Sequence, residues 1–247
     1  MHLISKRAAS QSLHVLLRCA LLFPAVLSMR AQFAVPPDAP TTECKVIPSR
    51  DPATLRILDS TAPVTYVFAC HEGKCLANTI QPKPDDPQST HIIATGERRG
   101  AWTCVFFDSV PGWIATNRLV PLPSEPAVPV QDWLGSYRMG KDLPHIQNNR
   151  LVLTAGTVPG SIHVSGQAFW YGSRANVHDG AIEADAIPFG PYLHVIDGAD
   201  ETSCVLDLVL SPADHSLSAN DNAQCGGMNV RFWGRWERFA PTAAHHK

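Results

Sequence analysis

The chain has 247 residues, of which 45% are hydrophobic and 17% are charged, and its formal net charge at pH 7 is −2. The hydrophobic share excludes a wholly disordered protein, and a mean hydropathy of −0.06 with a single long apolar run excludes a protein that spans a membrane several times. Twenty-one prolines and 16 glycines predict many turns and short elements rather than long helices.

The first 31 residues have the pattern of a secretory signal peptide. Lys6 and Arg7 precede an apolar stretch from Leu13 to Leu27, which is shorter than the roughly 20 residues that a membrane span needs. An amphipathic first helix is the alternative, but the segment has no evident capping residue or polar face. We therefore expect an exported protein, periplasmic or extracellular, without a membrane span.

Removal of this segment changes the charge of the chain. Cleavage after Ser28 or after Ala31 fits the pattern, so the mature protein is expected to begin between Met29 and Gln32. Residues 1–31 contain four basic residues and no acidic residue, and their loss moves the net charge from −2 to −6. Because nucleic-acid binding needs a basic surface, this charge argues against a nucleic-acid partner.

Six cysteines follow the signal segment, and an even number in an exported chain predicts disulfide bonds rather than a zinc site. Four of them precede a proline-rich segment near residue 125 and two follow it. The two that follow, Cys204 and Cys225, are expected to pair.

The four earlier cysteines allow more than one pairing. We favour Cys70–Cys75, which closes a tight hairpin, together with Cys44–Cys104, which ties the first strand of this part to the strand of Trp102. Cys44–Cys70 with Cys75–Cys104 remains open, because sequence alone does not fix the connectivity of four cysteines.

A proline-rich joint divides the chain. Four prolines lie between Pro121 and Pro129, a composition that gives a semi-extended segment and does not suit the interior of a sheet. The expected order is a signal peptide at 1–31, a Pro-rich spacer at 32–42, a first domain at 43–123, a Pro-rich linker at 124–130, a second domain at 131–240 and a disordered tail at 241–247.

Alternation of apolar and polar residues predicts strands throughout the second domain. Cys204, Leu206, Leu208 and Leu210 share one face of such a strand, and no window longer than ten residues has a clean helical stripe. Eight antiparallel strands in about 110 residues suit a small up-and-down barrel, lipocalin- or avidin-like in outline. The expected strands lie near 132–138, 150–155, 161–171, 181–187, 192–197, 203–211, 215–219 and 228–239.

One pattern occurs at both ends of the second domain. Residues 133–137 read Trp-x-Gly-x-Tyr, and residues 232–236 read Phe-x-Gly-x-Trp. If the first and last strands are neighbours, these aromatic residues are expected to stack across the pair, with glycine allowing a close approach.

Part of the first domain resembles a known family. The segments Gly100–Val105, Pro111–Ile114 and Arg118–Pro121 resemble the closing half of bacterial SH3-like (SH3b) domains, and the likeness covers roughly 43–123. The segment Leu55–Leu58 resembles their opening strand, although an arginine is common where Leu58 stands. The cysteine-bearing stretch from Cys70 to Pro87 departs from the family pattern. The resemblance implies a small SH3-like barrel.

The second domain resembles an uncharacterised family of exported bacterial proteins in which such a domain follows an SH3-like module. The most specific text is Cys-Gly-Gly-Met-Asn-Val-Arg-Phe at 225–232, within a likeness that covers about 131–240. No activity comes with the resemblance. Similar domains accompany lysozyme-inhibitor-like modules, which implies a role near the cell wall.

No motif predicts catalysis, a cofactor or a metal site. The Gly-x-Ser-x-Gly elbow is absent, the cysteines are better used in disulfides, and the two glycines after Cys225 follow a turn rather than opening a helix. His163, His178 and His194 lack the close spacing of metal ligands and are expected at the surface. Three carboxylates at 197–201 fit a solvated turn better than a calcium loop.

Exposed aromatic residues are the candidate binding groups. Strand alternation places Trp233 outward between Arg231 and Arg235, an arrangement that suits sugar rings, anionic glycans or a protein partner. A barrel interior that contains Trp133 and Trp170 is the other option, either filled by its side chains or enclosing a small apolar ligand. The candidate ligand-binding residues are Trp102, Trp113, Phe169, Tyr171, Arg231, Trp233 and Arg235.

Together these features predict an all-β, exported and non-enzymatic binding protein of the bacterial cell envelope. The SH3-like module is expected to contact cell-wall peptide or an envelope protein, with the barrel as a second interaction module. An inhibitor of a wall-degrading hydrolase such as lysozyme is the alternative, and a hydrolase with an unrecognised site is a third. The sequence names neither the ligand nor the oligomeric state.

Overall fold

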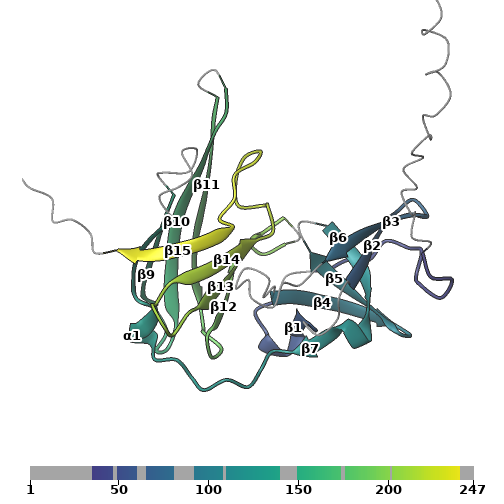
Figure 1. Cartoon of the computed structure of the whole chain (residues 1–247), viewed down its shortest axis with the longest axis horizontal. Coiled ribbons are helices and arrows are strands. Elements are labelled where there is room, and N and C mark those ends of the chain that lie inside the picture. The colour runs from purple at the N-terminus through teal and green to yellow at the C-terminus, as the bar shows by residue number, and fades with distance from the viewer. Residues whose placement is uncertain are drawn as a thin grey trace, which may run out of the picture. The chain divides into compact units, whose positions relative to one another are not determined.

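The computed structural model describes residues 35–46, 49–59, 65–80, 92–107, 110–139, 149–173, 176–200 and 202–239. The predicted signal peptide and the predicted tail at 241–247 lie outside these residues. The described part is almost entirely β-structure, arranged as two antiparallel sheets (Figure 1). The all-β prediction is therefore confirmed.

The first sheet has seven strands in the order β3-β2-β6-β5-β4-β1-β7. Within the described residues it is accompanied by two short 3-10 helices, η1 at Pro52–Thr54 and η3 at Thr116–Arg118. The expected opening strand at Leu55–Leu58 is present as β1. The strands are β1 Leu55–Leu58, β2 Thr65–His71, β3 Lys74–Ile80, β4 Ile92–Arg99, β5 Trp102–Phe107, β6 Val110–Ala115 and β7 Leu119–Pro121.

Both disulfides favoured for this part are formed. Cys70 and Cys75 are directly opposite each other on β2 and β3, and the turn between them has positive φ at Glu72 and Gly73, as hairpins of this length require. Cys44 is bonded to Cys104 of β5, which confirms the pairing. One detail is corrected, since Cys44 precedes the first strand instead of lying on it.

The second sheet has eight strands in the order β11-β10-β9-β8-β15-β14-β13-β12 and forms a nearly closed barrel. A one-turn helix, α1 at Val130–Trp133, precedes its first strand. The strands are β8 Gly135–Met139, β9 Arg150–Ala155, β10 Ile162–Tyr171, β11 Val177–Ala186, β12 Tyr192–Asp197, β13 Cys204–Leu210, β14 Leu217–Asp221 and β15 Gly234–Phe239.

Three predicted strands differ from the observed ones by three or more residues at their start. The strand expected at 132–138 begins after the turn of α1, and the strand expected at 181–187 begins four residues earlier, where Val177 pairs with Tyr171 of β10. The strand expected at 228–239 begins only at Gly234, because the preceding segment bonds to side chains instead of a neighbouring strand. The alternation of buried and exposed residues predicted for this segment is nevertheless present, since Val230 and Phe232 are buried.

The repeated aromatic pattern marks the neighbouring strands β8 and β15. In each copy the second aromatic residue donates to the carbonyl of the first: Tyr137 Oη to Trp133 O at 2.7 Å and Trp236 Nε1 to Phe232 O at 2.9 Å. The glycine between them has positive φ in both copies, which turns the chain so that this bond forms. The stacked pair lies within one copy, Phe232 on Trp236, rather than across the two strands as expected.

The barrel leaves a seam between β11 and β12, which we define as the gap between two adjacent strands that share no ladder of backbone bonds. The Glu183 N–H of β11 instead donates to the Asp197 carboxylate of β12, at 2.9 Å. Toward one end of the seam, Gly226 forms an isolated bridge with Gly180 of β11. The Asp197 side chain and the loop that contains Gly226 therefore bind β11 at the seam, where strand pairing does not close the barrel.

The described residues, which begin at Val35, belong to one compact unit. Tyr192 on β12 and Val209 on β13 belong to the apolar cluster that surrounds Trp102 and Trp113 of the first sheet. Outer residues of the barrel are therefore buried without belonging to its own core. The core of the barrel is a second cluster, which contains Trp133 and the remaining large inward side chains.

Candidate interaction surface

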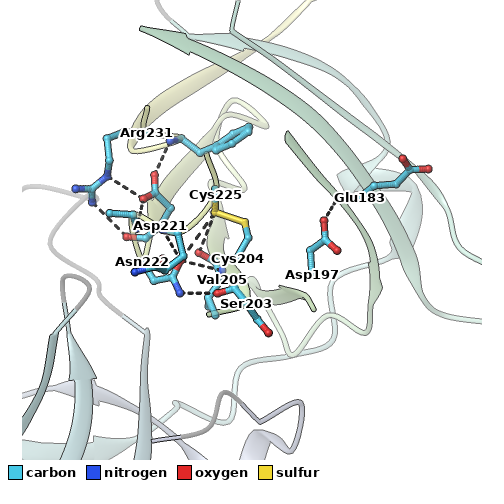
Figure 2. Close-up of a disulfide and its surroundings, with 12 residues drawn as sticks. Glu183, Asp197, Ser203, Cys204, Val205, Asp221, Asn222, Cys225 and Arg231 are labelled. Carbon is cyan, nitrogen blue, oxygen red and sulfur yellow. Dashed lines mark hydrogen bonds and ion pairs between the residues drawn. A yellow bond between two sulfur atoms is a disulfide. The ribbon is translucent and has the colours of Figure 1, made fainter. Parts of the chain in front are cut away.

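The connection from β14 to β15 is fixed by the predicted disulfide between Cys204 and Cys225, which is formed. Beside it, Asn222 is buried and accepts the Val205 N–H at 3.0 Å while its amide donates to Ser203 O at 2.8 Å. Figure 2 shows these residues gathered around the two sulfur atoms. The connection is a loop without regular structure that is nevertheless held in place by a covalent bond and buried hydrogen bonds.

Asp221 holds the other side of the same loop. Its buried carboxylate accepts the Phe232 N–H at 2.5 Å and the Ala223 N–H at 2.7 Å, and lies 2.8 Å from Arg231 Nε (Figure 2). Burial raises the pKa of Asp221, opposed by the charge of Arg231 and these hydrogen bonds. Arg231 is therefore engaged in positioning the loop.

The held loop crosses to β11. The Gly227 N–H donates to Asp179 O at 3.0 Å, and a Cβ on Gly227 would touch the ring of His178. The next residue, Met228, has 73% of its surface exposed. The loop therefore presents a large flexible apolar side chain to solvent from a rigid base beside the β10–β11 hairpin.

The β10–β11 hairpin extends beyond the neighbouring strands of the barrel (Figure 1). On its outer face Tyr171 pairs directly with Val177, which is 48% exposed, and Phe169 stacks on Tyr171 with ring centroids 6.2 Å apart. We call Phe169, Tyr171 and Val177 the hairpin patch. The prediction that Phe169 and Tyr171 point away from the core agrees with this arrangement.

The inner face of the same hairpin is also aromatic. Trp170 contacts the edge of His178 at 5.4 Å between ring centroids and packs partly against the barrel core. Trp170 is thus a support for the end of the hairpin. The interior of the barrel is filled by side chains, since Trp133, Tyr137 and Trp236 are completely buried.

Trp233 lies outward, as predicted, and is 51% exposed. Its two neighbouring arginines are occupied, however. Arg231 binds Asp221, and Arg235 binds the carboxylate of Asp214. The structure thus places an exposed indole between two ion pairs, which leaves less cationic surface for an anionic glycan than the sequence suggests.

Trp102 and Trp113 do not form a binding surface in the first sheet. Trp113 is completely buried and donates to Thr42 O at 2.7 Å, and Trp102 is 7% exposed with its indole nitrogen 3.3 Å from an Asp38 oxygen. Both belong to the core of this sheet, and the Arg99 guanidinium covers the ring of Trp113. The two tryptophans named as candidate ligand-binding residues are therefore buried residues of this core.

The histidines differ from the expected surface positions. His163 is partly buried 2.7 Å from Asp185, and hydrogen bonds from the Thr157 side chain, the Thr157 N–H and His163 lower the pKa of Asp185 to about 2. His194 is only 6% exposed and lies 2.5 Å from Asp207. Among the described residues, no group of three or more His, Cys, Asp and Glu side chains is arranged to hold a metal ion.

Sequence reasoning missed Val177, Met228 and the His194–Asp207 pair. Val177 precedes the strand expected at 181–187, and nothing in the sequence around Met228 distinguishes it from a core residue. The pair had a detectable signal, since His194 and Asp207 occupy matching positions on two neighbouring predicted strands.

Comparison of the chain with protein-family models, curated proteins and solved structures gave no match. Within the described ranges, no helix has both the length and the apolar character needed to cross a membrane.

Proposed function

We propose that this protein is an exported, non-enzymatic binding protein of the bacterial cell envelope, and that the barrel makes the contact. The observation that carries the proposal is the hairpin patch, in which Phe169, Tyr171 and Val177 lie together on a protruding hairpin. Three adjoining apolar side chains, two of them aromatic, have the composition of an interface hot spot.

The contact is assigned to the barrel because the described residues of the first sheet include no comparable group of adjoining aromatic and aliphatic side chains. Trp102 and Trp113, the aromatic residues expected to bind there, are held in its core. The hairpin patch also has a firm base, since Trp170 packs on the barrel core and Gly227 of the disulfide-held loop is bonded to Asp179. A rigid base reduces the entropy lost on binding, which favours recognition of a partner by a small patch.

An inhibitor of a wall-degrading hydrolase is the second candidate. It is favoured by the shape of the same element, because a narrow two-stranded hairpin with aromatic residues on both faces fits a concave substrate cleft. The two candidates use one surface and differ in the partner, which is either the wall polymer itself or an enzyme that acts on it.

The test compares a double variant, Tyr171→Ser with Val177→Ser, with the unchanged protein. We expect the protein to sediment with purified peptidoglycan and the double variant to lose about tenfold or more of that affinity, as removal of two hot-spot side chains predicts. Leu76→Ser is the matched control, because Leu76 is an exposed apolar residue, 74% exposed, on the β2–β3 hairpin of the other sheet.

The same three proteins are then tested as inhibitors of lysozyme. Inhibition that is abolished only in the double variant, without sedimentation on peptidoglycan, would select the inhibitor. Equal sedimentation of the double variant and the Leu76→Ser control would contradict the assignment of the contact to the hairpin patch. Binding to neither partner would reject both wall-directed functions.

A further inference from the structure

A pocket of about 460 Å³ lies against the outer face of β12. Its barrel wall comes from the β9–β10 turn, the β11–β12 turn and β12, where Val158, Ile187 and Phe189 contribute exposed apolar side chains. Leu55 and Ile92 of the first sheet line the opposite wall. This volume is within the range of small-molecule sites, and the walls are mainly apolar, as such sites usually are.

One polar side chain of the pocket, that of His194, has a ring nitrogen that is free to bond to a ligand. His194 is 6% exposed, and its Nδ1 lies 2.5 Å from Oδ1 of Asp207, the residue opposite it on β13. Its other ring nitrogen, Nε2, is buried and has no hydrogen-bond partner among the residues that the structure describes. A buried polar atom without a partner is costly, so an imidazole held in this orientation indicates a bound group that completes its bonding.

A second polar group lies at the rim of the pocket. Arg50 is exposed, lines the pocket and donates through one guanidinium nitrogen to the carbonyl of Ile196, at 3.0 Å. Ile196 is two residues from His194 on β12, and both Arg50 and His194 line the pocket. A guanidinium has five N–H donors, and this bond uses one of them.

Two other ionisable side chains, Asp185 and Tyr192, also line the pocket. The oxygens of Asp185 accept hydrogen bonds from Thr157 and His163. The pKa of Tyr192 is raised by burial, and by the nearby negative charge of Glu125, which keeps its hydroxyl neutral. Arg50 and the His194–Asp207 pair therefore set the charge preference.

The geometry points to a binding site for a small apolar carboxylate, with its hydrocarbon part in the apolar pocket and its carboxylate between Arg50 and His194. In this arrangement a protonated His194 donates from Nδ1 to Asp207 and from Nε2 to the ligand. The positive charges of Arg50 and the imidazolium then oppose the negative charges of Asp207 and the ligand. This inference is independent of the hairpin patch.

Octanoate is the probe, and titration calorimetry of the full mature chain is the measurement. We expect octanoate to bind with one site and octanol to bind at least tenfold more weakly, since the alcohol carries no charge for Arg50. We also expect octanoate to shift the imidazole resonances of His194 in an NMR spectrum. Equal affinity for the acid and the alcohol would overturn the charge recognition.

Two single variants locate the site. Arg50→Gln is expected to lower octanoate affinity about tenfold, and because Arg50 is exposed this change should not affect folding. Arg98→Gln, which removes the same charge from an exposed position on β4 outside the pocket lining, should leave the affinity unchanged. Equal effects of the two variants, or no octanoate binding to the unchanged protein, would refute the site.

Discussion

Asp185 illustrates how one exposed carboxylate connects a turn to a strand. Its Oδ2 accepts both the N–H and the hydroxyl of Thr157, at 2.9 and 2.6 Å, and its Oδ1 lies 2.7 Å from His163 Nδ1. All three contacts favour the charged form of the carboxyl. They therefore join β11 to the β9–β10 turn only while Asp185 is ionised.

This ionisation predicts a pH dependence of stability. The pKa of Asp185 is about 2 in the folded protein and 3.8 ordinarily, so its contribution is complete above about pH 5 and is lost as the pH falls from 4 to 2. We expect Asp185→Asn to lower the melting temperature at pH 7 and to approach the unchanged protein near pH 2. Circular dichroism melts over this range are the measurement, and a constant difference at every pH would contradict the assignment.

The burial of single residues could be predicted from the sequence only in part. Strand parity correctly put Trp233 outside and Phe232 inside, because alternation persists even where the segment is not a strand. Alternation along a strand shows which residues share a face, but not whether the outer face is open to solvent or covered by other residues. Trp113 and the side chain of His194 are buried, which alternation alone does not predict.

At the scale of elements, the disulfide loop between β14 and β15 has the largest expected effect on stability. Cys204 and Cys225 are 21 residues apart, and closing a loop of this length stabilises a protein by roughly 3 kcal/mol in chain-entropy estimates. The total for a domain of this size is only about 5–15 kcal/mol. Both cysteines also belong to the barrel core, so their loss removes packing as well.

We therefore expect Cys204→Ala with Cys225→Ala to lower the free energy of unfolding by about 3 kcal/mol or more in a urea titration. Cys70→Ala with Cys75→Ala is the matched control, since those cysteines are five residues apart on a hairpin and should cost clearly less. A double variant of Cys204 and Cys225 that unfolds at the unchanged urea midpoint would show that the bond adds no stability.

The bounds of a strand were easier to predict from the sequence where the strand has many buried apolar residues. Strands β9 and β12, which are rich in apolar residues, were predicted at their observed bounds. The first half of β11, Val-His-Asp-Gly, has little apolar character and forms because β10 provides a partner along its whole length. The loop before β15 is set by the contacts of Asp221 with distant backbone groups, which local sequence does not encode.

At the scale of the whole molecule, closure of the barrel depends on its weakest junction. Strand pairing closes every junction except the seam, where the Asp197 carboxylate and the disulfide-held loop take its place. The loop reaches β11 only because Gly180 has no side chain. A Cβ there would lie 2.2 Å from the carbonyl oxygen of Cys225 and 2.7 Å from Gly226 Cα, both of them backbone atoms.

Gly180→Ala is therefore expected to displace the loop and loosen the seam, at a cost of about 1–3 kcal/mol. Hydrogen exchange should accelerate at the Gly227 amide, which donates to Asp179, and at the Glu183 amide, which donates to Asp197. Gly227→Ala is the control, because the atoms that its Cβ would meet, at 3.2 Å and beyond, belong to the His178 side chain, which can move. If both amides exchange at the unchanged rate in Gly180→Ala, the loop does not close the barrel.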